Sequence, residues 1–275
     1  MFYQILARGM TMKNSIADLK TKVVIITGAS SGIGREMALS LGKAGGRVVA
    51  VARRIEKLNE LKEIAGETML TIAADVAVEA DCQKVIEQTV EKFGRIDVLV
   101  NNAGISMNAK FEETDISVFK NLMDVNYFGS LYLSKFSYPH LLETAGSVFF
   151  ISSVVGKRGF PTRSGYSAAK FAVQGLFESL RAEWVPQGIH VGIISPGFTD
   201  TSIRSKAFNA DGSLRGADGK TAGKIMSAGD AAGYILDAVS AKKREVILTG
   251  AGKFIVGVNK FFPKLTDTIV NKTLG

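Results

Sequence analysis

The chain has 275 residues and a formal net charge of +8; 46% of its residues are hydrophobic and 22% are charged. This length and composition are those of one soluble globular domain with a sizeable core. The single cysteine, Cys82, excludes an internal disulfide and favours a reducing, cytoplasmic setting.

The positive charge is compatible with a nucleic acid, an anionic membrane or a phosphorylated cofactor as partner. The longest basic run is only Lys242–Arg244, and the sequence has no nucleic-acid-binding motif, so we expect no nucleic-acid partner. No stretch approaches the ~20 apolar residues of a membrane-spanning helix. Residues 1–20 start with a short apolar segment that Gln4 interrupts, and they lack the charge pattern of a signal peptide. We therefore expect residues 1–20 to form a flexible leader.

Apolar runs rich in valine and isoleucine alternate with helical patterns along the rest of the chain. The expected strands are residues 23–26, 47–52, 69–73, 98–100, 148–151, 190–194 and 246–248. The expected helices are residues 35–41, 58–64, 79–93, 116–142 and 166–184. Strands that are apolar on both faces and separated by helices form parallel sheets, and their right-handed crossovers make the sheet doubly wound. The sequence therefore predicts a single α/β domain over residues 21–250, with a Rossmann-type, seven-stranded parallel sheet.

A glycine-rich stretch, Thr27–Gly34, joins the first expected strand to the first helix. Glycines allow a sharp turn and the close approach of a phosphate, and the first N–H groups of the helix then face the anion. The spacing Gly-x-x-x-Gly-x-Gly differs from the Gly-x-Gly-x-x-Gly fingerprint, so an ordinary tight turn is the alternative. Ligands of such sheets bind at the carboxyl ends of the strands, which favours the phosphate site, because the unusual residues all follow strands. These residues are Gly28–Gly34, Arg53, Asp75, Asn101, Ser153 and Pro196-Gly197.

Several short motifs, in this order and spacing, resemble the short-chain dehydrogenase/reductase family over about residues 21–248. They are Thr27-Gly28-(x)3-Gly32-Ile33-Gly34, Asp75-Val76, Asn101-Asn102-Ala103-Gly104, Asn126, Ser153, Tyr166-(x)3-Lys170 and Pro196-Gly197. The resemblance implies NAD(P)-dependent interconversion of alcohols and carbonyls. Ser152–Lys157 and Tyr166–Glu183 are most similar to the branch that contains 11β-hydroxysteroid dehydrogenase, which acts on steroids, retinoids and other bulky apolar carbonyls.

Tyr166 and Lys170 are four residues apart, so they share one face of the expected helix. A carbonyl oxygen that gains charge needs a proton, and a nearby ammonium lowers the pKa of a phenol from its usual value near ~10. Tyr166 is therefore the expected general acid/base. Ser153 is expected to bind the substrate oxygen, with its neighbour Ser152 as the rival and the family spacing favouring Ser153. Asn126 is expected to anchor a water that connects Lys170 to solvent.

Arg53 follows the second expected strand, where enzymes that use NAD place an acid for the ribose hydroxyls. Because a guanidinium can pair with a 2′-phosphate, we predict NADP(H) as cofactor; two solvated arginines at a helix start are the alternative. The resemblance implies that the ribose of the nicotinamide binds Lys170. It also implies cofactor contacts by Gly28, Ser30, Ser31, Gly32, Ile33, Gly34, Arg53, Asp75, Val76, Asn101, Asn102, Ala103, Gly104, Tyr166, Pro196, Gly197, Thr199 and Thr201. The two histidines, His140 and His190, lack a cluster of further ligands, so no metal site is expected.

Two segments complete the expectations. Residues 198–226 are polar and contain glycines, as in a lid over the substrate. Residues 251–275 form an amphipathic tail that Pro263 should kink. Its apolar residues at near-helical spacing, with lysines beside them, are Phe254, Val258, Phe261, Leu265 and Ile269. This tail covers a partner subunit or its own core, lies on an anionic membrane surface, or frays.

The sequence thus predicts an NADP(H)-dependent oxidoreductase that interconverts a carbonyl and a secondary alcohol on a moderately bulky, apolar small molecule. The family resemblance implies a homodimer or homotetramer. The alternatives are a 3-oxoacyl-thioester reductase of the same family and a non-catalytic NADP(H)-binding sensor or scaffold. The latter is disfavoured because Ser153, Tyr166, Lys170 and Asn126 are all present.

Overall fold

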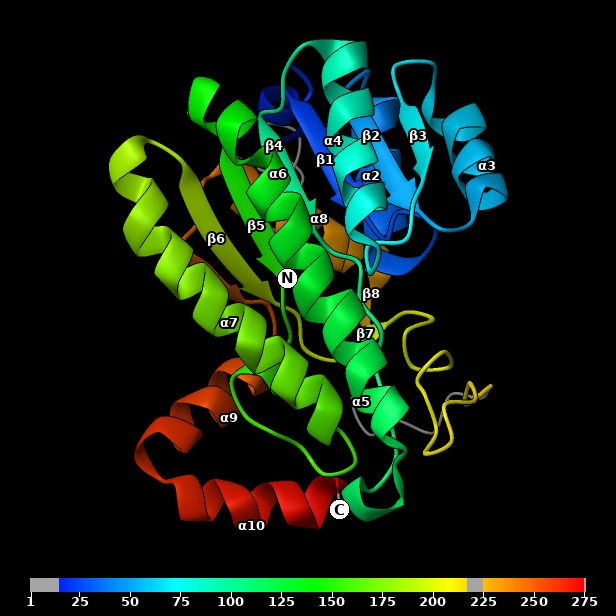
Figure 1. The fold of residues 1–275 in the computed structure, drawn as a ribbon. Coiled ribbons are helices and arrows are strands. Elements are labelled where there is room, and N and C mark those ends of the chain that lie inside the picture. Colours follow the sequence, from blue (N-terminus) through cyan, green and yellow to red (C-terminus); the bar gives the residue numbers. More distant parts are fainter. Residues whose placement is uncertain (1–14, 217–224, 275) are drawn as a thin grey trace, which may run out of the picture.

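A central sheet of seven parallel strands organises the computed structural model, which describes residues 15–216 and 225–274 (Figure 1). The strand order is β3-β2-β1-β4-β5-β6-β9, and every neighbouring pair is parallel. The strands are β1 Val23–Thr27, β2 Arg47–Ala52, β3 Leu70–Ala73, β4 Val98–Asn101, β5 Ser147–Ile151, β6 His190–Ser195 and β9 Glu245–Ile247. The doubly wound, seven-stranded parallel sheet is thereby confirmed. The order reverses between β1 and β4, which is where such sheets bind ligands.

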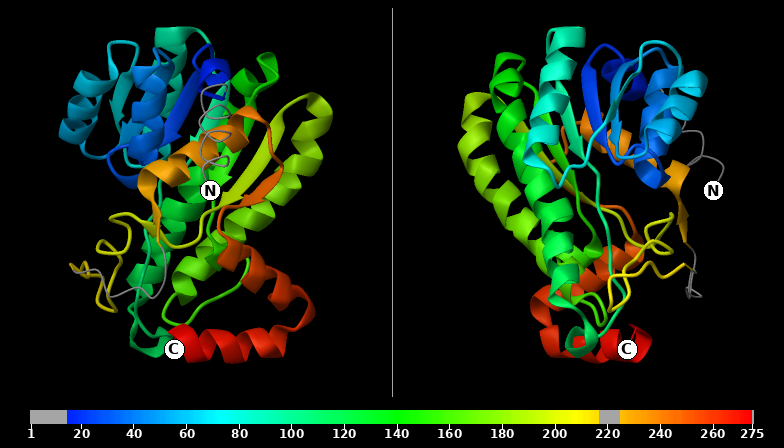
Figure 2. Two further views of the ribbon diagram at one scale, coloured as in Figure 1. Left: turned by 180° about the vertical axis from the view of Figure 1, so that it is seen from behind. Right: turned by 45° about the vertical axis from the view of Figure 1, so that its right-hand side comes forward.

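Helices cover both faces of the sheet, as the views in Figures 1 and 2 show. On one face lie α2 (Gly32–Lys43), α3 (Ile55–Ala65) and α8 (Ala228–Ser240). On the other lie α4 (Glu79–Phe93), α6 (Gly129–Glu143) and α7 (Ser164–Trp184), with α5 (Ile116–Met123) preceding α6.

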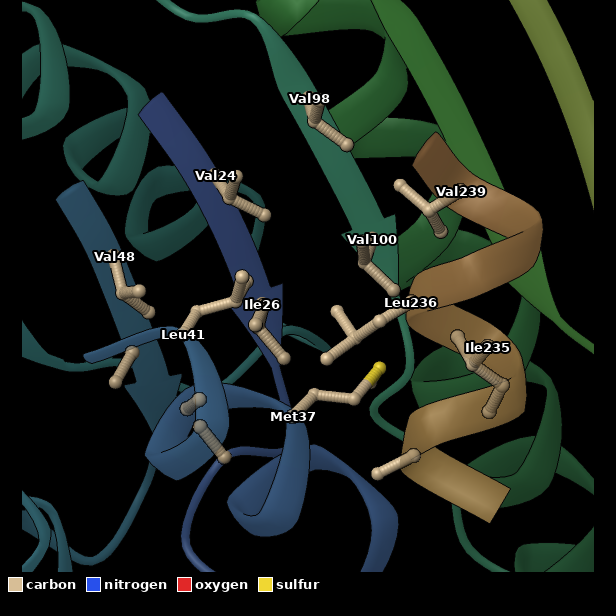
Figure 3. Packing of buried hydrophobic residues seen from close by; sticks show 14 of the residues in the cluster. Val24, Ile26, Met37, Leu41, Val48, Val98, Val100, Ile235, Leu236 and Val239 are labelled. Carbon is tan, nitrogen blue, oxygen red and sulfur yellow. The ribbon is translucent and has the colours of Figure 1, made fainter. Parts of the chain in front are cut away.

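Alternation along β1 divides its side chains between the two cores. Val24 and Ile26 pack with Met37 of α2 and Leu236 of α8 (Figure 3), whereas Ile25 belongs to the cluster on the opposite face. Because both faces are covered, all five residues of β1 are buried. This double burial explains why the strands read as continuous apolar runs.

The long helix expected over residues 116–142 is interrupted. A π-helical turn, Asp124–Phe128, separates α5 from α6. π-turns leave no mark on hydrophobic periodicity, and they occur frequently at functional sites. Asn126 lies at the centre of this turn.

Three smaller expectations need correction or comment. Residues 15–19 are helical and Leu19 is 1% exposed in the core, so an undocked leader does not extend to residue 20; residues 1–14 lie outside the described residues. In α3 the buried face ends with Ala65, and Ile64 is exposed. Cys82 packs in the core, where burial raises the pKa of its thiol to about 12.

The C-terminal tail forms two helices, α9 (Gly250–Phe261) and α10 (Pro263–Leu274), with the break at the expected proline. Both fold back on the domain (Figure 1). Gly252 is buried against Val154, and Asp267 pairs with Arg158. The described tail is therefore helical and contacts its own domain. No helix within residues 15–216 and 225–274 has both the length and the apolar sequence that crossing a membrane requires.

Candidate active site

The glycine-rich loop between β1 and α2 packs closely on the turn that follows β4. Gly28 has φ +69°, and a Cβ there would lie 2.9 Å from the Ala103 Cα. A Cβ at Gly34 would lie 2.5 Å from the Asn102 Nδ2 and 2.6 Å from the Gly28 carbonyl oxygen. The glycines are therefore required where the loop and the end of β4 meet, and the N-terminus of α2 opens toward this edge of the sheet.

Thr27 and Asn102 fasten the ends of β1 and β4 together. The Asn102 side chain donates to the Thr27 carbonyl oxygen at 2.7 Å, and the Thr27 hydroxyl accepts from the backbone N–H groups of Asn102 and Ala103 at 2.9 Å. These bonds hold the two strand ends in register beside the loop.

The first of two connected cavities has a volume of about 460 Å³ and lies over this loop. A volume of ~300–1,000 Å³ is typical of small-molecule sites. Its walls come from the loop, from the ends of β2 and β3, from the turn after β4, and from the segment after β7 (Thr199–Asp200). Among the predicted cofactor residues, it brings together Gly28, Ser30, Ser31, Gly32, Ile33, Arg53, Asp75, Val76, Asn102, Ala103, Gly104 and Thr201.

Two arginines flank this cavity at the end of β2. Arg54 donates to the Ser30 hydroxyl at 2.8 Å. Arg53 is mostly exposed, and its Nη1 lies 3.7 Å from the Asp75 Oδ2. The loop, the helix N-terminus and these cations together fit a phosphorylated dinucleotide.

The second cavity, of about 240 Å³, contains three of the four predicted catalytic side chains, and the fourth, Asn126, lines neither cavity. Tyr166 and Lys170 reach it from α7, and Ser153 reaches it from the end of β5. It shares Ile33, Asn102, Gly104, Thr201 and Ile203 with the first cavity, so the two form one continuous cleft. The predicted residues Pro196, Gly197 and Thr199 also line the second cavity.

Tyr166 is 8% exposed, and opposing influences act on its phenol. Burial raises its pKa, whereas a hydrogen bond from Ser153 and the positive charge of Arg163 lower it. Ser152 and Ser153 both line this cavity. The Ser153 hydroxyl accepts from the Val155 N–H at 3.3 Å, whereas the Ser152 hydroxyl has no hydrogen-bond partner among the described residues.

Lys170 is fully enclosed beside the tyrosine. Its Nζ donates to the Ile151 carbonyl oxygen at 3.0 Å and lies 5.7 Å from the centre of the Tyr166 ring. Burial lowers the pKa of Lys170 to about 7. The two side chains share a face of α7, as their spacing predicts.

Asn126 supports this arrangement from the π-helical turn. Its Nδ2 donates to the carbonyl oxygens of Leu122 and Ile105 at 2.9 and 3.0 Å, and its Oδ1 accepts from the Ile105 N–H at 3.3 Å. A Cβ at Gly104 would lie 2.7 Å from the Asn126 Oδ1 and 3.4 Å from the Lys170 Nζ. Gly104 therefore leaves the space in which Asn126 and Lys170 approach each other.

Two predicted cofactor residues, Gly34 and Asn101, line neither cavity. Asn101 is 2% exposed, and its side chain donates to the Ser134 hydroxyl of α6 at 3.2 Å. Successive side chains of a strand point to opposite faces, so Asn101 turns into the helical layer while Asn102 turns to the cleft.

Arg163 is the cleft residue that sequence reasoning missed. It precedes Tyr166 by three residues, and its guanidinium donates to the Ser106 hydroxyl and to the Met107 carbonyl oxygen. Arg163 is the N-cap residue of α7, so it lies within one turn of Tyr166, and its position three residues before the tyrosine could have revealed it. With Arg204 it makes the substrate cavity partly cationic, beside apolar walls from Val155, Phe160, Pro161, Phe198 and Ile203.

The doubly wound sheet and the cleft define a dinucleotide-dependent oxidoreductase. A family model for short chain dehydrogenases matches residues 22–212. The chain belongs to the short-chain dehydrogenase/reductase family.

Known relatives and structures agree with this assignment. The chain is 39% identical to dehydrogenase/reductase SDR family member 7B of Mus musculus, over 86% of this chain and 75% of the relative. It is also 39% identical to 11-beta-hydroxysteroid dehydrogenase A of Sesamum indicum, over 70% of this chain and 57% of the relative, which confirms the expected similarity to that branch.

Two solved structures with bound cofactors have the same fold. An alcohol dehydrogenase from Thermococcus sibiricus, complexed with 5-hydroxy-NADP, has a TM-score of 0.71 and 26% identity over 82% of this chain and 95% of its own. A 3-ketoacyl-(acyl-carrier-protein) reductase from Brucella melitensis, complexed with NADH, has a TM-score of 0.73 and 28% identity over 84% and 96% of the two chains. This chain is therefore an oxidoreductase of a family that binds nicotinamide cofactors.

Proposed function

We propose that this enzyme uses NADP(H) to interconvert a carbonyl and a secondary alcohol on a moderately bulky, largely apolar small molecule. The observation that carries the proposal is that Tyr166, Lys170 and Ser153 line the second cavity, which is continuous with the first cavity over the glycine-rich loop. We call the first the cofactor cavity and the second the substrate cavity. The bound nicotinamide would supply hydride to a carbonyl carbon, or accept it from an alcohol carbon.

The chain's own residues would handle the oxygen and its proton. In reduction, the Ser153 hydroxyl donates a hydrogen bond to the substrate oxygen, and the Tyr166 phenol transfers its proton to that oxygen as charge develops there. The positive charges of Lys170 and Arg163 then stabilise the phenolate that remains. In the oxidative direction the same phenolate removes the hydroxyl proton.

Asn126 acts in this proposal as a positioning residue. Its amide ties the Ile105 backbone to the π-helical turn and lies beside the Lys170 pocket. A water on this side would return a proton to Lys170 and then to Tyr166, as the sequence led us to expect.

The choice of NADP(H) rests on Arg53, Arg54 and the absence of an acid directly after β2. An arginine can bind the 2′-phosphate as an oxyanion, whereas NAD lacks that group. The Arg53–Asp75 contact does not remove this capacity, because Arg53 is mostly exposed.

Cofactor oxidation with a panel of ketones tests the proposal. We expect a higher kcat/KM with NADPH than with NADH, and activity on bulky apolar ketones that Tyr166→Phe abolishes while cofactor binding persists. A preference for NADH would overturn the cofactor assignment. Activity confined to 3-oxoacyl thioesters would favour a reductase of that class, and cofactor binding without turnover of any carbonyl would favour a sensor or scaffold.

We also propose that the chain assembles as a homodimer or homotetramer and that its tail contacts anionic membranes. The exposed faces of α9 and α10 carry Phe254, Phe261, Phe262 and Leu265, with Lys253, Lys260 and Lys264 also exposed. Large apolar side chains beside lysines fit the headgroup region of an anionic bilayer.

Sedimentation at several protein concentrations tests the proposed homodimer or homotetramer, and a single monomeric species would exclude it.

A further inference from the structure

A short segment after β7 lines both cavities of the cleft. Thr201 and Ile203 line both of them, Arg204 lines the substrate cavity, and Lys206 lines the cofactor cavity. In Figure 1 the yellow segment lies below the carboxyl edge of the blue strands, and Figure 2 agrees from behind. Lys206 reaches the cleft from a part of the chain more than 150 residues after both the glycine-rich loop and β2.

The backbone beside Lys206 is fixed rather than loosely exposed. The Lys206 N–H donates to the Ser202 carbonyl oxygen at 3.0 Å, and the next residue, Ala207, is completely buried. Phe208 exchanges backbone bonds with the segment after β4, donating to the Ser106 oxygen at 2.9 Å and accepting from the Asn108 N–H at 2.8 Å. Lys206 is therefore held at the cavity wall by its neighbours.

Lys206 faces two further cations across this cavity. Partial burial and the charges of Arg54 and Arg53 lower the pKa of Lys206. Arg54 is hydrogen-bonded to the neutral hydroxyl of Ser30, and Arg53 has Asp75 at 3.7 Å as its ion-pair partner among the described residues. The lining of this cavity thus contains three cations, Arg53, Arg54 and Lys206, and a single nearby carboxylate, that of Asp75. The excess positive charge is complementary to a doubly charged anion.

We propose that Lys206 is the third cation of the site for the cofactor's 2′-phosphate, together with Arg53 and Arg54. This inference rests on the proposed use of NADP(H). A 2′-phosphate bound among the three side chains relieves their mutual repulsion, and it connects the end of β2 to the segment that also walls the substrate cavity. Lys206 would therefore contribute to the discrimination between NADPH and NADH, although it lies outside the end of β2 to which the sequence assigns this discrimination.

Lys206→Gln tests this role, because the side chain is exposed and the substitution keeps its polar character. We expect the Kd for NADPH to rise about tenfold, as for the loss of one hydrogen bond to a charged group, with the Kd for NADH unchanged. Lys206→Arg should retain the preference. Lys84→Gln, an exposed lysine of α4 outside both cavities, is the control for net charge.

Adenosine 2′,5′-bisphosphate and adenosine 5′-monophosphate are the matched probes for calorimetry. The advantage of the bisphosphate should shrink in Lys206→Gln and should fall as salt is raised in the native enzyme. Equal weakening of both probes, or no change in either, would overturn the role of Lys206.

Arg53→Gln distinguishes this failure from failure of the proposed cofactor. If Arg53→Gln removes the NADPH preference and Lys206→Gln leaves it intact, only the role of Lys206 is overturned. If the native enzyme itself does not prefer NADPH, the proposed cofactor and the role of Lys206 both fall.

Discussion

Tyr166 has to exchange a proton while it is buried, and its surroundings act on the phenol in opposite directions. Desolvation favours the neutral phenol, and the Ser153 hydrogen bond and the Arg163 charge favour the phenolate. Lys170 is buried so completely that its own pKa falls to about 7, so its charge is present below neutrality and diminishes above it. The Arg163 guanidinium stays charged throughout this range. Arg163 is therefore the permanent cation of the site.

Replacing Arg163 by Met should shift the pH dependence of alcohol oxidation. Oxidation needs the phenolate, so its kcat/KM rises as the pH passes through the pKa of Tyr166. Loss of the positive charge raises that pKa, and the rise should move upward by about 1 pH unit. The measurement is kcat/KM against pH, with Arg163→Lys expected to restore the native midpoint. An unchanged midpoint in Arg163→Met, whatever happens to the rate, would exclude electrostatic action on Tyr166.

At the scale of elements, the close packing of the loop before α2 requires glycines, which have no Cβ. The space that a Cβ at Gly34 would occupy is already taken by the Asn102 amide and by the Gly28 backbone. Because these contacts lie below 3 Å and one of them is to backbone, a side chain at this position requires the loop itself to move.

Gly34→Ala should therefore weaken cofactor binding at least tenfold and destabilise the fold by about 1–3 kcal/mol, as overpacking does. Gly175→Ala is the matched control, because Gly175 lies inside α7 with nothing within 4 Å of an added Cβ. It should leave binding intact and stabilise the protein by about 0.5–1 kcal/mol. Fluorescence titration with NADPH and urea denaturation measure the two effects. Native affinity in Gly34→Ala would show that the close packing is not needed for binding.

The tail gives a second prediction at this scale. The apolar residues Phe254, Phe261 and Phe262 point outward, while Thr266 and Val270 face the domain. Changing the three phenylalanines to Ser should abolish flotation with phosphatidylserine vesicles and leave Tm nearly unchanged, because no buried contact is lost. Vesicles of neutral lipid are the control, since lysines contribute only with anionic lipid. Equal flotation of the native protein and the triple variant would remove the membrane proposal.

The elements were predictable from sequence to different extents, for physical reasons. Buried strands such as β1 and β2 are marked by their composition, and the expected range of β2 matches residue for residue. The π-helical turn at Asn126 depends on one extra residue in a turn, which periodicity does not register. In the tail, periodicity predicts a face that includes Phe261 and Leu265, but the face that packs inward contains Thr266. Which face is buried depends on the shape of the domain, and the sequence of the helix does not contain that information.

The same distinction holds for the site. Motif and spacing predicted that Tyr166, Lys170 and Ser153 lie together, and all three line one cavity. This was predictable because helix geometry and strand order together determine their positions. Asn101 lines neither cavity, because successive side chains at the end of a strand point to opposite faces. Arg163 precedes the Tyr166-(x)3-Lys170 motif by three residues, so its spacing could have pointed to it. Lys206 comes from a segment without a recognisable motif, and only the folded chain brings it to the cleft.

On the scale of the whole molecule, the cofactor cleft joins parts of the chain that are distant in sequence. Its walls come from the loop after β1, from the ends of β2 and β3, from the turn after β4, and from the segment that follows β7. A ligand that binds only when these parts are assembled stabilises the native state, because the unfolded chain has no such site. The gain in stability should be larger for a cofactor with a 2′-phosphate, because the cations proposed to bind that group come from two separate segments.

We therefore expect NADPH to raise Tm clearly more than NADH does at the same concentration. At 100 times its Kd, a ligand adds about 2.7 kcal/mol of stability, and a domain of this size gains about 2–4 °C for each kcal/mol. NADPH should thus raise Tm by about 5–10 °C, and Lys206→Gln should bring the NADPH value close to that for NADH. Differential scanning fluorimetry of the full chain measures these shifts, with Lys84→Gln as the control. Equal shifts for the two cofactors in the native protein would mean that the three cations do not recognise the 2′-phosphate, whereas a large NADPH shift that persists in Lys206→Gln would assign that recognition to the β2 arginines alone.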